Sequence, residues 1–416
     1  MDYKKIELNK ATLHIFKTKK FKKMTIDVIM SDMVNETNLS YRMLLSRMME
    51  SKSSKYDTKQ KINRKLDMLY GANFGFSSLK LGNVCYIDAS IDGVNPKYVG
   101  DDTLLDEMFK FLSEMLFNPI LDKKNLDEEK RLLLDDYKEE YENKSLYAVI
   151  RSNEIAFKYE LARLKFNGDE KIVKSLTCKD LEEYYKYMIE NNKVDSIVMG
   201  DVSDDVIDEV KKYFDFGKKN KLNPIDYVDK EIINSEYVKE EAKSMQSQLI
   251  LKYRTFTRMN DKDDLALVLA NTIFGGFSSS LLFSVVREKE SLCYSISSNY
   301  GRYKGIVNVC LGINKENYDK ALKVTMEQFD RMVSGNFSDE LLEMAKLSLI
   351  SSIKKGTDSL SSIAKKIYLS ELLNENLDLY DGIEEIKNLT KEDVINVMKK
   401  LKLDLVYFLE GSDNDE

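Results

Sequence analysis

The chain has 416 residues, of which 43% are hydrophobic and 32% are charged, and its net charge is −7. This composition is that of a globular protein, and the length predicts two domains of about 200 residues rather than one core. Lys and Arg are interleaved with Asp and Glu throughout, so we expect no nucleic-acid partner. No run of about 18 apolar residues occurs, so we expect no membrane-spanning helix.

Four cysteines are widely spaced and form no C-x-x-C pair, which argues against a zinc ribbon or a disulfide framework: Cys85, Cys178, Cys293 and Cys310. Reduced thiols favour a cytoplasmic location. The first residues show no apolar signal-peptide region, which favours the same location. The richness in Lys, Asn, Ile and Tyr, with three prolines and no Trp, suggests a bacterial source. The single histidine is His14, in a strand-like run.

The first half of the chain shows patterns of both strands and helices. Alternating residues predict strands over 5–17, 22–31, 72–79, 84–91 and 195–199. Apolar residues at helical spacing predict helices over 39–50, 59–69, 102–116, 126–142, 145–165 and 178–190.

The second half repeats this order. Strands are expected over 249–255, 292–298 and 404–409. The strand over 292–298 is expected to continue into a hairpin that ends at residue 313. Helices are expected over 263–274, 281–286, 317–333, 338–375 and 392–401.

Short matches between the halves support a duplicated domain. Leu-Thr-Cys-Lys-Asp at 176–180 parallels Leu-Thr-Lys-Glu-Asp at 389–393, and the strand from Asp195 parallels the strand from Asp404. Asn-Val-Cys at 83–85 and at 308–310 occurs in equivalent strands. Grouped strands and grouped helices predict an α+β fold with two homologous domains, each an antiparallel sheet with helices on one face.

The domain boundaries follow from a polar stretch. We expect an N-terminal domain over 1–215, a linker over 216–233 with Pro224 inside it, and a C-terminal domain over 234–416.

The most distinctive stretch is FGGFSSSLLFSVVREKESLCYSISSNY, from Phe274 to Tyr300. It predicts a turn, a helix, a turn and a strand. Each residue has an ordinary structural interpretation. Gly275-Gly276 fits a turn at a helix start, Arg287 a solvated cation at a helix end, and Tyr294 a strand aromatic.

Taken together, the double glycine and S-S-x-L-F-x-x-V-R-E-x-x-x-L-x-Y resemble the second-domain signature of the pitrilysin/insulinase-type zinc peptidases, a family that includes the mitochondrial processing peptidase. The duplicated domain extends the resemblance over the whole chain. Ser291 departs from the family pattern, which has Gly there.

Active members of that family carry the inverted zinc motif H-x-x-E-H on the first long helix, with a distant Glu as third ligand. The resemblance places Met43, Ser46 and Arg47 at the first His, the Glu and the second His, and Asp135-Asp136 near the third ligand. Because the only histidine lies on a strand, we expect no zinc site and no other cofactor.

Other catalytic chemistry finds little support. A Cys–His pair would need His14 as its base, and Ser278–Ser280 have no base. Four acidic residues of one helix are more simply a solvated face than a metal site: Asp135, Asp136, Glu139 and Glu140. We therefore expect no catalysis by the chain in isolation.

The family contains heterodimers in which one subunit has lost the zinc site. The resemblance implies such a subunit, with an active H-x-x-E-H sibling as partner and a peptide substrate in a shared chamber. Gly275, Gly276, Arg287 and Tyr294 are then its substrate-binding residues. Within the family, the chain is most similar to the short bacterial silent subunits of the YfmF type, which are associated with the 5-aminopentanol modification of elongation factor P.

Two alternatives stay open. One is a homodimeric peptide-binding or scaffold protein without a peptidase partner, and the other is a peptidase with unrecognised chemistry. An adjacent reading frame encoding H-x-x-E-H favours the heterodimer.

Overall fold

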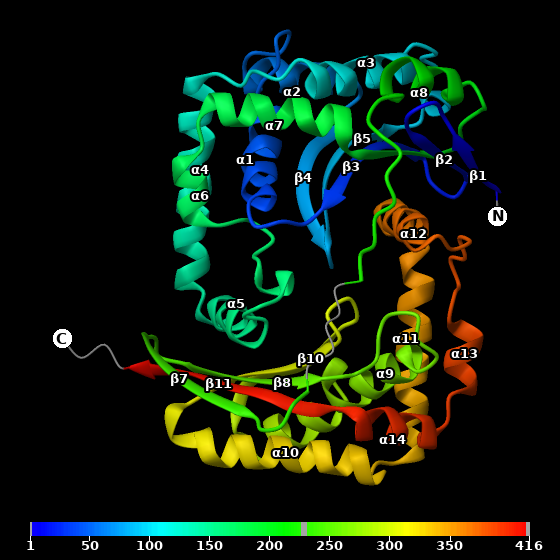
Figure 1. Cartoon of the computed structure of the whole chain (residues 1–416). Coiled ribbons are helices and arrows are strands. Elements are labelled where there is room, and N and C mark those ends of the chain that lie inside the picture. Colours follow the sequence, from blue (N-terminus) through cyan, green and yellow to red (C-terminus); the bar gives the residue numbers. More distant parts are fainter. Residues whose placement is uncertain (1, 226–230, 413–416) are drawn as a thin grey trace. The chain divides into compact units, whose positions relative to one another are not determined.

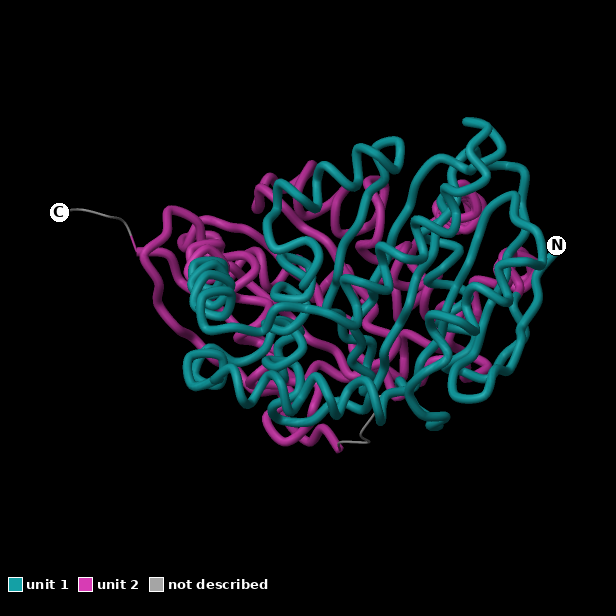
Figure 2. Tube along the Cα trace, turned by 90° about the horizontal axis from the view of Figure 1, so that it is seen from above, with its two compact units in different colours: residues 1–137, 164–224, 359–377 teal, residues 138–163, 225–358, 378–416 magenta. Residues whose placement is uncertain are grey.

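The structure, a computed structural model, describes residues 2–225 and 231–412, and the chain divides into two compact units (Figure 2). Unit 1 consists of residues 1–137, 164–224 and 359–377, and unit 2 of residues 138–163, 225–358 and 378–416. The units therefore differ from the expected domains 1–215 and 234–416, because each includes a short segment from the other half of the sequence. The expected linker over 216–233 includes residues 226–230, which lie outside the described residues.

Unit 1 contains a six-stranded sheet in the order β1-β2-β6-β3-β5-β4 (Figure 1). Its strands are β1 (Asp2–Glu7), β2 (Thr12–Lys17), β3 (Lys23–Met33), β4 (Asn73–Leu81), β5 (Val84–Val94) and β6 (Lys193–Gly200). The strand expected over 5–17 is thus two strands, β1 and β2. The pairing is antiparallel except between β2 and β6, which run parallel.

Most helices of unit 1 cover one face of this sheet. They are α1 (Asn38–Ser51), α2 (Lys59–Met68), α3 (Leu104–Phe117), α4 (Lys123–Glu142, whose last turn falls in unit 2), α6 (Glu170–Ser175), α7 (Cys178–Asn191) and α8 (Val206–Phe214). Alternate residues of β3 point into their core, for example Met24, Ile26 and Val28, all 0% exposed. Burial of these side chains supplies the main driving force for the unit.

Unit 2 contains a five-stranded sheet in the order β7-β11-β8-β10-β9, with one parallel pair, β7 and β11. Its strands are β7 (Glu236–Lys243), β8 (Ser247–Arg254), β9 (Cys293–Gly301), β10 (Ile306–Ile313) and β11 (Lys402–Ser412). Its helices include α5 (Lys144–Ala156), α9 (Asp264–Asn271), η3 (Thr272–Gly276), η4 (Leu282–Lys289), α10 (Tyr318–Ser334), α11 (Asp339–Gly356), α13 (Ile383–Asn388) and α14 (Lys391–Lys400).

The predicted α+β fold with two sheet-and-helix domains is confirmed, but each sheet also carries a helix on its second face. In unit 2, Ala148, Ala156 and Phe157 form a second core with Ile250 and Tyr407, on the opposite face from the main core. In unit 1, α12 (Leu360–Leu373) contacts β6, and Tyr368 is hydrogen-bonded to Ser31 of β3. The physical reason is that the central strands are buried on both faces, as every residue of β8 is, so each sheet needs a second cover.

Local features of the two units support the duplication. Thr177 and Asp180 form a reciprocal capping box at the start of α7, and Thr390 and Asp393 form the same box at the start of α14. Each of these helices leads directly into the central strand that carries the matched aspartate, β6 or β11. The Asn-Val-Cys match is offset within equivalent strands, because Asn83 precedes β5 whereas Asn308 lies inside β10.

None of the helices in residues 2–225 and 231–412 combines the length and the apolar content that a membrane crossing requires.

Candidate functional site

A pocket of about 680 Å³ lies in unit 1, where α1, α2, β4 and α4 meet. This volume falls in the range of small-molecule and side-chain binding sites. One strand of its wall, β4, lies at the edge of the sheet and, among the described strands, pairs with β5 alone (Figure 1).

Met43, Ser46 and Arg47 all line this pocket, because their spacing of three and four residues places them on one face of α1. The Ser46 hydroxyl donates a hydrogen bond to the Met43 carbonyl oxygen (3.0 Å). The Arg47 guanidinium forms an ion pair with Asp136 of α4. The three side chains thus present a thioether, a hydroxyl used by the helix and a paired cation, none of which is a strong zinc ligand.

The acidic helix α4 contributes a residue that the sequence reasoning missed. Glu129 lines the pocket, whereas Asp136 pairs with Arg47 and Asp135 lies 3.3 Å from Arg131. Glu129 is only 5% exposed and accepts no hydrogen bond from any residue that the structure describes. Burial raises its pKa, although the charges of Lys59 and Arg47 oppose this. Its spacing of seven residues from Asp136 was the available signal, because residues seven apart share a helix face.

A second glutamate in the pocket contacts the edge strand. The Glu50 carboxylate of α1 accepts a hydrogen bond from the Phe76 backbone N–H of β4 (2.9 Å). The side chain therefore occupies one backbone donor of a strand that otherwise offers its outer edge for pairing.

The predicted substrate-binding residues of unit 2 lie on η3, η4 and β9. Tyr294 lies on β9, an edge strand, is 62% exposed, and donates a hydrogen bond to Oδ1 of Asn314 (3.1 Å). Arg287 is exposed, and its guanidinium lies 4.6 Å from the centre of the Phe283 ring. Within the described residues, no hydrogen bond or ion pair joins Arg287 to Tyr294.

The two glycines differ in their surroundings. Gly275 is buried, and a Cβ there would lie 2.7 Å from Leu282 Cδ1 and 2.8 Å from the Ser298 backbone nitrogen. Gly276 is exposed, and its nearest contact would be the Asn271 carbonyl oxygen at 3.2 Å. Close packing therefore requires glycine at 275 and much less so at 276.

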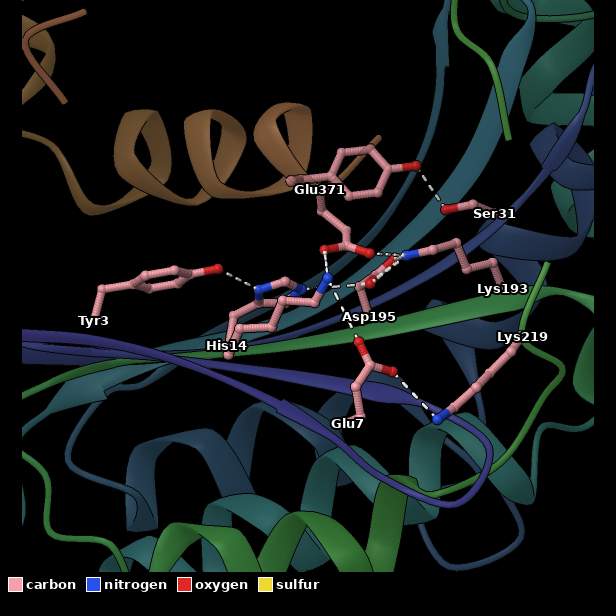
Figure 3. Close-up of polar contacts among 10 residues, drawn as sticks. Tyr3, Glu7, His14, Ser31, Lys193, Asp195, Lys219 and Glu371 are labelled. Carbon is pink, nitrogen blue, oxygen red and sulfur yellow. Dashed lines mark hydrogen bonds and ion pairs between the residues drawn. The ribbon is translucent and has the colours of Figure 1, made fainter. Parts of the chain in front are cut away.

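The single histidine belongs to a buried polar network on the second face of the unit 1 sheet (Figure 3). His14 Nδ1 lies 2.9 Å from the Tyr3 hydroxyl, and Nε2 lies 3.4 Å from Asp195 Oδ1. Potential ligand atoms of His14, Asp195 and Glu371 lie within 4.8 Å of one another, as in a metal site.

Lysines already neutralise both carboxylates of this network. Lys193 Nζ lies 2.5 Å from Asp195 and 3.1 Å from Glu371, and Lys5 Nζ lies 2.7 Å from Glu371. Burial of Asp195 opposes its ionisation, but the hydrogen bond from His14 and the charge of Lys193 outweigh burial and lower its pKa. A cation would have to displace two ammonium groups. The network instead fixes α12, which carries Glu371, on the sheet.

Unit 2 holds its second-face helix in a similar way. The ammonium of Lys252, 0% exposed, lies 2.7 Å from Asn153 of α5 and 2.7 Å from Asn308 of β10. Burial lowers the pKa of Lys252 to about 7. Nearby, Arg254 bridges Glu160 (2.8 Å) and Asp404 (2.9 Å).

Comparisons with known proteins agree with this architecture. The family model of the peptidase M16 inactive domain matches residues 175–349. "Probable inactive metalloprotease YmfF" of Bacillus subtilis (strain 168) is 30% identical over 411 residues, which cover 97% of this chain and 96% of that protein. "Uncharacterized zinc protease YmxG" of the same organism is 22% identical over 296 residues, 70% of this chain and 71% of that protein. The solved structure of a conserved protein from Enterococcus faecalis V583 matches with a TM-score of 0.94 and 28% identity over the whole of both chains.

Proposed function

The chain belongs to the peptidase M16 family as an inactive homologue, and we propose that it is the non-catalytic, peptide-binding subunit of a heterodimeric zinc metallopeptidase. Its partner is an active sibling with the H-x-x-E-H motif. The observation that carries the proposal is the pocket of unit 1, in which Met43, Ser46 and Arg47 share one face of α1 beside an edge strand.

We assign Met43, Ser46 and Arg47 to the motif's first His, Glu and second His. Glu129 takes the place of the third ligand, in correction of Asp135-Asp136, because it faces the same pocket while Asp136 is bound to Arg47. An Arg at a ligand position places a fixed cation where a zinc dication would sit, and a Ser cannot replace the Glu that activates water. The pocket therefore binds rather than hydrolyses.

The proposed peptide adds to β4 as an extra strand. Edge strands bind extended peptides through backbone hydrogen bonds, and adjacent pockets select side chains. The Phe76 N–H that Glu50 now occupies becomes available when that carboxylate swings aside. The exposed strand β9 with Tyr294, and Arg287 at the end of η4, serve the chamber shared with the partner. The free thiols of the four cysteines support a cytoplasmic complex.

Co-expression with the H-x-x-E-H sibling tests this function. The two chains should elute as one complex of one-to-one stoichiometry in size exclusion with light scattering, and the complex should cleave an unfolded peptide. A sibling with Gln in place of the motif Glu should assemble equally but cleave nothing. Separate elution at micromolar concentration removes the basis of the heterodimer. A species of twice the chain's mass without the sibling favours the homodimeric scaffold.

A further inference from the structure

The pocket of unit 1 contains two carboxylates that form no ion pair with any described residue. Glu50 accepts only the Phe76 N–H, and Glu129 accepts no hydrogen bond. Ser78 of β4, in the same pocket, has a buried hydroxyl oxygen without a partner in the described structure. Glu50 is exposed, whereas Glu129 is buried. A buried carboxylate without a donor is costly, so Glu129 and Ser78 point to a ligand that supplies hydrogen-bond donors.

The cations near the pocket do not meet this need. Arg47 is paired with Asp136, and Lys59 is an exposed side chain at the pocket. The charges of Lys59 and Arg47 favour the ionised form of Glu129, but burial has the larger effect and raises its pKa.

The remaining wall of the pocket combines polar residues, such as Asn63 and Ser77, with an apolar part. Phe74 and Phe76 come from β4, and Ile62 and Leu66 come from α2. The two phenyl rings lie edge to face, with centroids 5.5 Å apart. Apolar side chains beside carboxylates suit a ligand with an aliphatic stem and a cationic head.

We propose that this pocket binds a basic side chain, Lys or Arg, of an extended peptide, with the aliphatic stem on Phe74 and Phe76 and the charged head on Glu129 and Glu50. The inference takes the peptide from the proposed function and adds the side-chain class that the subunit selects. The edge of β4 lies beside the pocket, so a peptide strand paired there can direct one side chain into it.

The smallest test uses the capped amino acids Nα-acetyl-lysine N-methylamide and its norleucine counterpart, titrated against the full chain by NMR or calorimetry. The lysine compound should bind at least tenfold more tightly, because only it brings a charge to the unpaired carboxylates. The variant Glu129→Gln should reduce this preference to within about twofold. Glu139→Gln, an exposed residue of the same helix, is the matched control and should keep it.

Equal binding of the two compounds, or an unchanged preference in Glu129→Gln, overturns the inference. The variant removes an unpaired buried carboxylate, so its melting temperature should equal or exceed that of the wild type. The same comparison of affinities can be made with capped arginine and capped citrulline on the wild-type chain. Its result does not depend on any variant. Assembly with the sibling is measured separately, so a failed preference with an intact complex removes this inference and leaves the proposed function standing.

Discussion

The guanidinium of Arg47 on α1 and the carboxylate of Asp136 on α4 form an ion pair beside the pocket of unit 1. Because guanidinium stays protonated and has no acceptor atom, it cannot ligate a metal. We therefore expect the purified chain, after dialysis, to hold far less than one zinc per molecule by elemental analysis, and to cleave no unfolded peptide. About one zinc per chain, removed by chelator together with a peptidase activity, contradicts this expectation.

The same geometry predicts what restores the metal. The triple variant Met43→His, Ser46→Glu and Arg47→His rebuilds H-x-x-E-H on one face of α1, opposite Glu129. It should bind about one zinc per chain, and adding Glu129→Gln should weaken binding by at least tenfold, because a ligand is lost. The matched control adds Asp135→Asn instead and should retain the metal. If Asp135→Asn weakens zinc binding as strongly as Glu129→Gln, the assignment of Glu129 fails.

Lys252 predicts a pH dependence of stability in unit 2. Its pKa is lowered from 10.5 to about 7 by burial. Between these values the unfolded chain holds a proton that the folded chain does not, so the free energy of unfolding rises with pH across this window. Below pH 7 both states are protonated, and the cost of the buried ammonium is present in full. This cost in the free energy of unfolding is on the order of a few kcal/mol.

Lys252→Met removes this contribution. Relative to the wild type, its free energy of unfolding should be highest below pH 7 and fall steadily as the pH rises towards 10, as measured by urea denaturation at each pH. Lys243→Met, an exposed residue of β7, is the control and should give a profile parallel to the wild type. Parallel profiles for Lys252→Met would mean that the buried amine keeps an ordinary pKa.

Local patterns predicted much of the fold but not its long-range partners. The capping boxes at Thr177 and Thr390 could be read directly, because both halves of a box lie within four residues. Glu371, by contrast, meets His14 only after α12 has crossed to the unit 1 sheet, and no local pattern states which sheet a helix covers. Glu129 shows the same limit. Helical spacing puts it on one face with Asp136, a signal that the sequence analysis did not use, and only the packing of α4 shows that this face lines a pocket.

The double glycine allows a test that separates packing from binding. Gly275→Ala should lower the free energy of unfolding by about 1–3 kcal/mol, because the new methyl group overpacks against Leu282 and Ser298. Gly276→Ala should cost clearly less, because its closest contact would be at 3.2 Å. Chemical denaturation of both variants checks the order. Equal losses would mean that the close approach at Gly275 is not limiting.

Arg287 and Tyr294 provide the sharpest test of the proposed chamber shared with the sibling. In the proposed complex, the tyrosine hydroxyl donates to the developing oxyanion and the arginine holds the peptide. Such donors act only if they are fixed where charge develops, and loss of one typically lowers turnover by about 100- to 1000-fold. In the isolated chain, Tyr294 donates to Asn314 and Arg287 lies over Phe283. Both side chains are exposed, so we expect substitutions there to affect folding little.

Tyr294→Phe keeps the ring and removes only the donor, so the reconstituted complex should assemble normally and lose turnover on its peptide. Arg287→Ala should lose turnover as well, with a larger rise in KM if it holds the substrate. Asn314→Ala is the control, because it removes the acceptor of the Tyr294 hydrogen bond but leaves the tyrosine hydroxyl as a donor. The turnover of the complex with this variant should stay near wild type. If the complexes with Tyr294→Phe and Arg287→Ala both assemble and their turnover stays within about twofold of wild type, the pair serves only in packing. Removal of a donor at the reacting centre would lower turnover far more.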